Sequence, residues 1–100
     1  MSAVRCSVQV SGELRDLIPQ FLANRRLDVE RLDAALGRGD FDTVRRIGHT
    51  LRGGGGGYGF NEITRLGAAI EARAKAREPG LSALVRELAD YLAGVDVVYD

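Results

Sequence analysis

The chain lacks several residues that mark common classes of protein. It has no tryptophan, one cysteine, one histidine and two prolines among 100 residues. A single cysteine excludes an internal disulfide, and we expect Cys6 to be an ordinary small apolar residue. The one histidine has no second histidine or nearby cysteine with which to share a metal ion, so the residue types give little support to a metal site.

Net charge and long apolar runs are also missing. Fourteen basic residues balance fourteen acidic ones, so overall charge does not favour nucleic acid or an anionic membrane as a partner. No segment approaches the roughly 20 apolar residues of a membrane span, and the first ten residues lack the apolar core of a signal peptide. We therefore expect a cytoplasmic protein that binds neither nucleic acid nor membranes.

What the chain does have is apolar residues, 45% of the total, mostly at helical spacing. The first apolar stripe predicts one long helix over residues 12–37, kinked near Pro19, with two separate helices as the alternative. The stretch "GRGD" ends this stripe. Either Gly37 or Gly39 is expected at the helix C-terminus, and Asp40 as the cap of the next helix.

Three further helices are predicted. The second begins at Phe41 and runs into a stretch of glycines, the third is capped by Asn61, and the fourth has its apolar side between Leu81 and Val95. Four amphipathic helices with short connections favour an antiparallel four-helix bundle, an all-α domain over residues 12–100.

Residues 1–11 do not follow the helical period. Val4, Cys6, Val8 and Val10 alternate with polar residues, which predicts a short extended tail laid against the bundle. No strand pattern is long enough to predict a sheet.

The one histidine lies just before the glycine run, in "GHTLRGGGGGYGF". On a helical wheel Val44, Ile47 and Leu51 form the inward stripe of the second helix, and His49 falls away from it. The imidazole is therefore predicted to be exposed to solvent.

The neighbours of His49 at spacings of three and four residues are Arg45, Arg46, Arg52 and Gly53. A neutral imidazole is a nucleophile, and nearby guanidinium groups would stabilise a phosphoryl group added to it. Gly53 leaves open space for a partner. This combination favours a phosphoryl acceptor, and the plain alternative is a surface histidine without a special task.

The glycine run formally contains G-x-G-x-x-G in Gly54, Gly56 and Gly59. A dinucleotide site needs a preceding strand, whereas here a helix precedes, and no P-loop lysine follows. Nucleotide binding is therefore not expected. Because each helical glycine costs about 1 kcal/mol relative to alanine, we expect the first two or three glycines of the run to be helical and the last ones to fray.

The segments "IGHTLRGGGGGYGF" and "LGAAIE" resemble the histidine-containing phosphotransfer (HPt) domain family. The signature of that family is His-x-x-Lys-Gly followed, after small residues, by another glycine. Here His49, Arg52, Gly53 and Gly59 fill those positions, and the resemblance extends across residues 13–93.

The resemblance implies a four-helix bundle with the active histidine exposed on its second helix. His49 would accept a phosphoryl group at Nε2 from an aspartyl phosphate on a receiver domain and pass it to another receiver. Arg52 stands where the family usually has lysine, so the charge is kept but the phosphate contact differs. Gly53 would give the receiver room, and Gly59 would let the chain turn or pack closely.

The resemblance also implies a division of labour with the partner. The receiver domains of hybrid histidine kinases and response regulators would supply a divalent metal and most of the catalytic groups. This chain would then be a monomeric phosphocarrier without a cofactor of its own, and not an enzyme. The alternative within the same resemblance is a helical adaptor that docks receiver or kinase domains without accepting phosphate.

Overall fold

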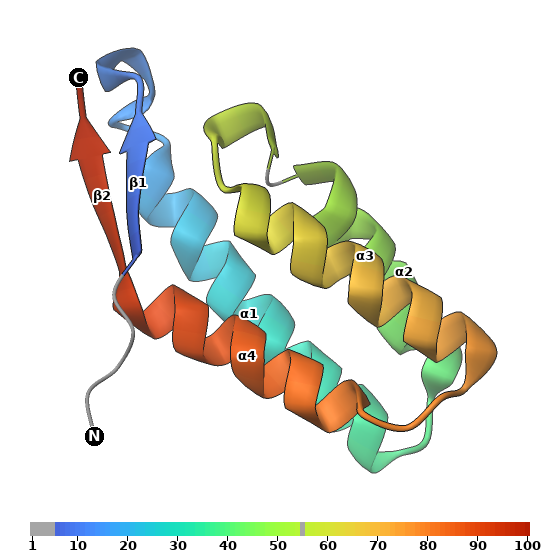
Figure 1. Ribbon diagram of the computed structural model, residues 1–100. Coiled ribbons are helices and arrows are strands. Elements are labelled where there is room, and N and C mark those ends of the chain that lie inside the picture. Colours follow the sequence, from blue (N-terminus) through green and yellow to red (C-terminus); the bar gives the residue numbers. More distant parts are fainter. Residues whose placement is uncertain (1–5, 55) are drawn as a thin grey trace.

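Four α-helices form the body of the molecule, which is a computed structural model (Figure 1). They are α1 (Ile18–Gly37), α2 (Phe41–Gly54), α3 (Asn61–Ala76) and α4 (Leu81–Gly94). The structure describes residues 6–54 and 56–100. Helices α2 and α3 make one layer and α1 and α4 the other, and consecutive helices run in opposite directions. The predicted all-α, antiparallel four-helix bundle is confirmed.

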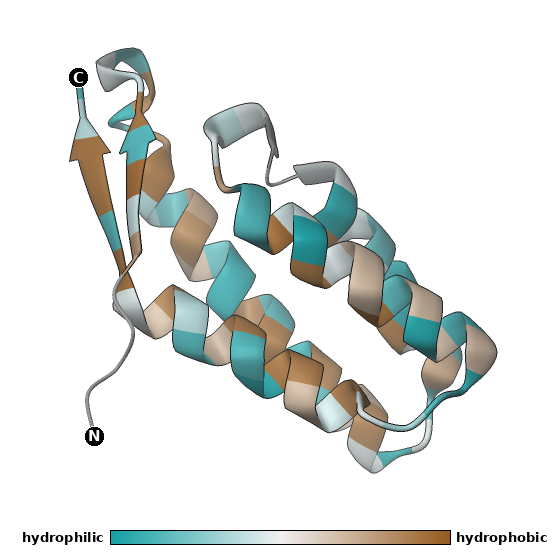
Figure 2. Cartoon of the chain, viewed as in Figure 1, coloured by the Kyte–Doolittle hydropathy of each residue, from teal (hydrophilic) through white to brown (hydrophobic). Residues whose placement is uncertain are grey.

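The core lies between these two layers and is formed mainly by one buried face from each helix. Hydrophobic and hydrophilic residues alternate along every helix (Figure 2), as expected for helices that bury one face only. The largest fully buried side chains of the helices are Ile18, Leu32, Val44, Leu51, Ile63, Leu66, Ile70, Val85, Leu88 and Leu92. Each such burial contributes about 1.5–3 kcal/mol relative to leaving the side chain exposed.

The first helix is shorter than predicted. The expected helix over residues 12–37 is wrong at its start, because Gly12–Leu14 forms a separate 3-10 turn, η1, and α1 begins at Ile18. Pro19 lies in the first turn of α1. A proline has no N–H to donate, so it is tolerated in a first turn, where that N–H would be unpaired, and disfavoured further inside a helix.

A small sheet joins the two ends of the chain, and the expectation that no sheet forms is wrong. Strand β1 (Cys6–Val10) pairs in parallel with β2 (Val95–Tyr99), with Cys6 opposite Val95. The extended tail is therefore strand β1, and its Val10 is buried in the core. Val4 of the predicted alternation lies outside the described residues.

The same sheet corrects the fourth helix. Val95 was expected on its apolar face, but α4 ends at Gly94 and Val95 is the first residue of β2. The sequence from Val95 onward is "VDVVY", which is rich in the β-branched residues that favour strands. Its partner strand lies at the other end of the chain, so no hairpin turn next to Val95 indicates that this segment belongs to a sheet.

The helix ends follow the predicted chemistry, with one exception. Gly39 follows α1 with a φ of +68°, and Asp40 accepts a hydrogen bond from the Thr43 backbone N–H at 3.1 Å, capping α2. Asn61, expected as a cap, is instead the first residue of α3, and Phe60 holds the cap position without a side-chain hydrogen bond.

The glycine run begins as predicted. Gly53 and Gly54 are helical, and Gly56–Tyr58 forms a 3-10 turn, η2; Gly55 lies outside the described residues. No helix in the described part of the chain is both long enough and apolar enough to cross a membrane.

Candidate functional site

Two glycines bring α2 and α3 into backbone contact. A Cβ built on Gly48 would lie 2.7 Å from the backbone nitrogen of Glu71, and a Cβ on Gly67 would lie 2.5 Å from the backbone nitrogen of Arg52. Real Cβ contacts are not this short, so any side chain at either position would force the helices apart. Of all helix pairs in the bundle, α2 and α3 pack the most closely.

This close contact places a carboxylate beside the histidine. Glu71 lies one helical turn after Gly67 on α3, and its Oε2 is 2.9 Å from Nδ1 of His49. The His49 side chain is 62% exposed, whereas that of Glu71 is 20% exposed. The predicted exposure of His49 is confirmed, and the ring is held from one side while its other side stays open.

Arg52 completes the cluster by bridging the other two side chains. Its Nε lies 3.2 Å from Glu71 Oε1, and its Nη2 lies 3.1 Å from His49 Nδ1. A planar guanidinium has several donors at fixed angles. Two of them therefore reach two different partners, which a single lysine ammonium would do less well.

The Nδ1 atom of His49 has two neighbours but can serve only one of them. It can donate a hydrogen bond to Glu71, or it can accept one from Arg52. An unprotonated Nδ1 would face the carboxylate at 2.9 Å with two lone pairs opposed, whereas a protonated Nδ1 makes a charge-assisted hydrogen bond at that distance. The carboxylate therefore favours the tautomer with the proton on Nδ1.

This choice of tautomer defines the reactive atom. In a neutral imidazole one nitrogen carries the proton and the other carries a free lone pair. With Nδ1 donating to Glu71, the lone pair is on Nε2, on the side of the ring away from the carboxylate. The arrangement makes Nε2 a nucleophile, because an adjacent group fixes the ring and its proton.

The two signature glycines lie in different surroundings. A Cβ on Gly53 would meet no described atom within 4 Å, so the surface one turn after His49 is open. Gly59 has a φ of +90° in the turn between η2 and α3, and a Cβ there would lie 3.5 Å from the carbonyl oxygen of Gln9. The turn needs glycine because other residues rarely adopt a positive φ.

The structure brings one of the three predicted arginines to the histidine. Among the arginines in the described part of the chain, only Arg52 makes a polar contact with His49. Arg45 is partly buried, and Arg46 is directed toward Thr43, to whose hydroxyl it donates a hydrogen bond at 3.3 Å. A phosphate-stabilising role for Arg45 and Arg46 stays a prediction.

Glu71 is the site residue that sequence reasoning missed. It belongs to the mixed-charge stretch "EARAKARE", a pattern that usually indicates a solvated helix face. A usable signal was nevertheless present, because Gly48 directly precedes His49 and Gly67 precedes Glu71 by one helical turn. Two apposed glycines in neighbouring helices indicate close packing, and close packing brings the following side chains together.

Comparison with known proteins gives one match. The family model described as "Hpt domain" matches residues 16–96, a range that contains all four helices and the cluster of His49, Arg52 and Glu71. Searches of curated proteins and of solved structures returned no significant match.

Proposed function

This chain belongs to the Hpt domain family, whose members carry phosphoryl groups on histidine in phosphorelays, and we propose that His49 is its phosphoryl acceptor. The donor is an aspartyl phosphate on a receiver domain, and a second receiver takes the group onward. The observation that supports this assignment best is the exposed ring of His49, held at Nδ1 by Glu71 2.9 Å away.

The transfer step uses the lone pair that this contact leaves on Nε2. That lone pair forms the N–P bond while the bond from phosphorus to the aspartyl oxygen breaks, and the bonding electrons return to the aspartyl carboxylate. The ring gains positive charge as the N–P bond forms. Glu71 stabilises this charge through the Nδ1–H hydrogen bond, in the way that a buried carboxylate supports a catalytic imidazole. Onward transfer reverses these bond changes with a second carboxylate.

Arg52 and Gly53 have supporting roles in the proposal. The Arg52 guanidinium lies on the Nδ1 side of the ring and its side chain is 49% exposed. It would turn toward Nε2 to attract the oxygens of a phosphoryl group there. Gly53 leaves the space through which the receiver's active site approaches. The receiver supplies the divalent metal and the remaining catalytic groups, so this chain acts as a phosphocarrier and not as an enzyme.

The test is phosphoryl transfer from labelled receiver domains. Phosphorylated receivers from the host are mixed with the wild-type chain and with His49→Gln, and acid-labile phosphate on the chain is measured. We expect labelling of the wild type and none of the variant, with equal helicity by circular dichroism. Labelling that persists in His49→Gln would falsify the assignment of the acceptor.

The same experiment separates the carrier from a docking-only adaptor. A receiver that binds the wild type and His49→Ala with equal affinity, while no acid-labile phosphate forms on either, would identify an adaptor. The exposed and oriented imidazole favours the carrier, because docking alone has no need of a nucleophile.

A further inference from the structure

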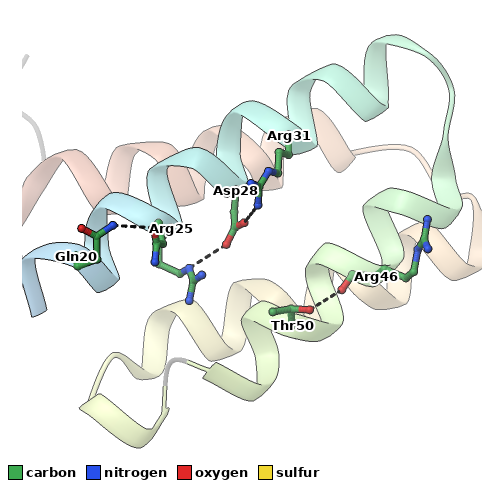
Figure 3. Close-up of polar contacts among 7 residues, drawn as sticks. Gln20, Arg25, Asp28, Arg31, Arg46 and Thr50 are labelled. Atoms are coloured by element: carbon green, nitrogen blue, oxygen red, sulfur yellow. Dashed lines mark hydrogen bonds and ion pairs between the residues drawn. The ribbon is translucent and has the colours of Figure 1, made fainter. Parts of the chain in front are cut away.

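A groove with a positively charged rim runs between α1 and α2, beside the His49 site but not part of it. Its volume is about 470 Å³, and arginines line it from both helices, Arg31 and Arg38 on the α1 side and Arg46 on α2. Figure 3 shows Asp28 and Arg31 on α1 beside Arg46 and Thr50 on α2. The chain as a whole has no net charge, so this group of arginines is a local feature.

The three arginines keep most of their hydrogen-bonding capacity for a partner. Arg31 and Arg38 have side chains that are 67% and 59% exposed, and each reaches its neighbouring aspartate only at 3.4 Å. Arg46 donates to a hydroxyl at 3.3 Å. These contacts are long for hydrogen bonds to charged groups, so a carboxylate from outside can replace them at little cost.

Asp28 is the acidic residue of the groove lining, and it does not neutralise the rim. Asp40, beside Arg38, is held as the cap of α2. Asp28 is 6% exposed, and its Oδ2 lies 2.9 Å from Nε of Arg25, outside hydrogen-bonding geometry but close enough for an ion pair. Arg25 itself lies over the ring of Phe21 and is not a lining residue of the groove. Arg25 therefore balances the charge of Asp28, and the arginines leave the rim of the groove with a positive charge.

The shape of the groove suits a helix. Its lining follows the two helices lengthwise, and Arg31 and Arg38 are seven residues apart, which is two helical turns or about 10 Å. Ala34 and Ile47 add apolar surface between the charged rims. An apolar floor with charges along its edges is the form of a groove that binds one face of an amphipathic helix.

The groove is continuous with the open surface at the histidine. Arg46 precedes His49 by three residues and Thr50 follows it directly, and at 100° per residue Arg46 and Gly53 lie on the same side of α2. A helix seated in the groove therefore lies within about one helical turn of the imidazole, next to the space left by Gly53.

We propose that the α1–α2 groove binds an acidic amphipathic helix of the receiver partner and selects receivers by that charge. This inference rests on the proposed function, because it takes the partner to be a receiver that transfers phosphate to His49. Arg31 and Arg38 act as docking residues that do not touch the reacting atoms. Their charge attracts the partner and raises the rate of encounter, an effect that salt weakens.

The experiment compares two double variants of equal charge. Arg31→Gln/Arg38→Gln removes two charges from the groove. Arg15→Gln/Arg86→Gln removes two exposed charges elsewhere and serves as the control. The probe is the phosphorylated receiver domain that labels the wild type fastest. The rate of transfer is measured against receiver concentration at several salt concentrations. Here kcat is the maximal rate, and KM is the receiver concentration that gives half of it.

We expect the groove variant to raise KM about tenfold at low salt with little change in kcat, and to show a weaker salt dependence than the wild type. The control variant stays near the wild-type KM. Chemical labelling of His49 by phosphoramidate, a small donor that needs no docking, proceeds at one rate in all three proteins.

Each other outcome counts against a specific part of the argument. A groove variant with wild-type KM and salt dependence overturns the docking proposal and leaves the phosphocarrier assignment intact. A KM effect that high salt does not reduce overturns the acidic character of the partner. Slower labelling by phosphoramidate would show that the arginines support the histidine itself. If no receiver labels the wild type, the proposed function fails and this inference fails with it.

Discussion

The substitution Gly67→Ala tests whether the contact between α2 and α3 sets the geometry at His49. The added Cβ would lie 2.5 Å from the Arg52 backbone nitrogen and 2.7 Å from Cβ of Leu51. Neither atom is the end of a flexible side chain, so the clash cannot be relieved by a rotamer change. The two helices must instead move apart by about 0.5–1 Å to restore ordinary van der Waals contact.

The cost follows from two opposing terms. Overpacking of a filled interior costs about 1–3 kcal/mol, and the upper end applies because this helix pair is the most closely packed in the bundle. Alanine recovers about 1 kcal/mol of helix propensity relative to glycine. The net loss in the free energy of unfolding is therefore about 2 kcal/mol, which for a domain of this size lowers Tm by roughly 10 °C.

The same movement weakens the site. Glu71 and His49 are on opposite sides of the widened contact, so their 2.9 Å hydrogen bond is strained or lost. A loss of about 1 kcal/mol from that charge-assisted bond corresponds to a rate about fivefold lower in labelling by phosphoramidate. Because phosphoramidate needs no docking, the change reports on the imidazole alone.

Urea unfolding followed by circular dichroism measures the stability, and acid-labile phosphate measures the labelling rate under conditions where the variant is folded. Gly37→Ala is the matched control, because a Cβ on Gly37, the last residue of α1, meets no described atom within 4 Å. Its stability should equal or exceed that of the wild type. If Gly67→Ala is as stable as this control and is labelled at the wild-type rate, the glycine contact does not position the site.

Four further substitutions have distinct expected outcomes. Glu71→Gln should slow labelling by phosphoramidate about tenfold and shift the ring toward the Nε2–H tautomer in nitrogen NMR; an unchanged rate and tautomer would remove Glu71 from the mechanism. Arg52→Lys keeps the charge but not the bridging geometry, so receiver transfer should fall between the wild type and Arg52→Ala, and a wild-type rate would show that charge alone suffices. Gly53→Ala should raise stability by up to about 1 kcal/mol and slow transfer from a receiver without affecting phosphoramidate labelling; receiver transfer at the wild-type rate would contradict the role of the open surface. Burial raises the pKa of Tyr91 from 10.0 in the unfolded chain to about 12 in the folded protein. The neutral hydroxyl therefore favours the folded state fully below pH 10, and this stabilisation is lost as pH rises through about 12. Because its hydroxyl is buried without a hydrogen-bond partner in the described structure, Tyr91→Phe should be neutral near pH 7 and reduce the alkaline loss measured by urea unfolding; an equal alkaline loss in the variant would contradict the assignment.

The bundle was predictable because its signal is local. Ile63, Leu66 and Ile70 repeat at helical spacing, and all three are fully buried. The same wheel argument predicts these three residues inward and His49 outward, and the His49 side chain is 62% exposed. Periodicity within one helix is enough for both results, because amphipathic helices of a bundle bury one face.

The parts that were missed depend on contacts between distant segments. Strand β2 forms because it pairs with β1, which lies at the other end of the chain. The two strands are not joined by a turn, so the local sequence does not indicate that they pair. Glu71 reaches His49 across 22 residues of sequence. Its charge is typical of a solvated helix face. A helical wheel describes the faces of one helix, so it does not show how close Glu71 on α3 lies to His49 on α2.

The glycines of α2 show why the open surface beside His49 points to a partner. Gly48 lies in the interior of the 14-residue helix α2 and Gly53 in its last turn. Glycine weakens a helix relative to alanine by about 1 kcal/mol in the interior and by less near the C-terminus. At Gly48 this cost is offset within the fold, because the backbone of α3 occupies the space of the missing side chain. At Gly53 no described atom occupies that space, so packing inside the chain does not offset the cost. A glycine that weakens its helix without improving packing is expected where function requires it. At Gly53 we expect that requirement to be a receiver domain, which would occupy the open space in the complex.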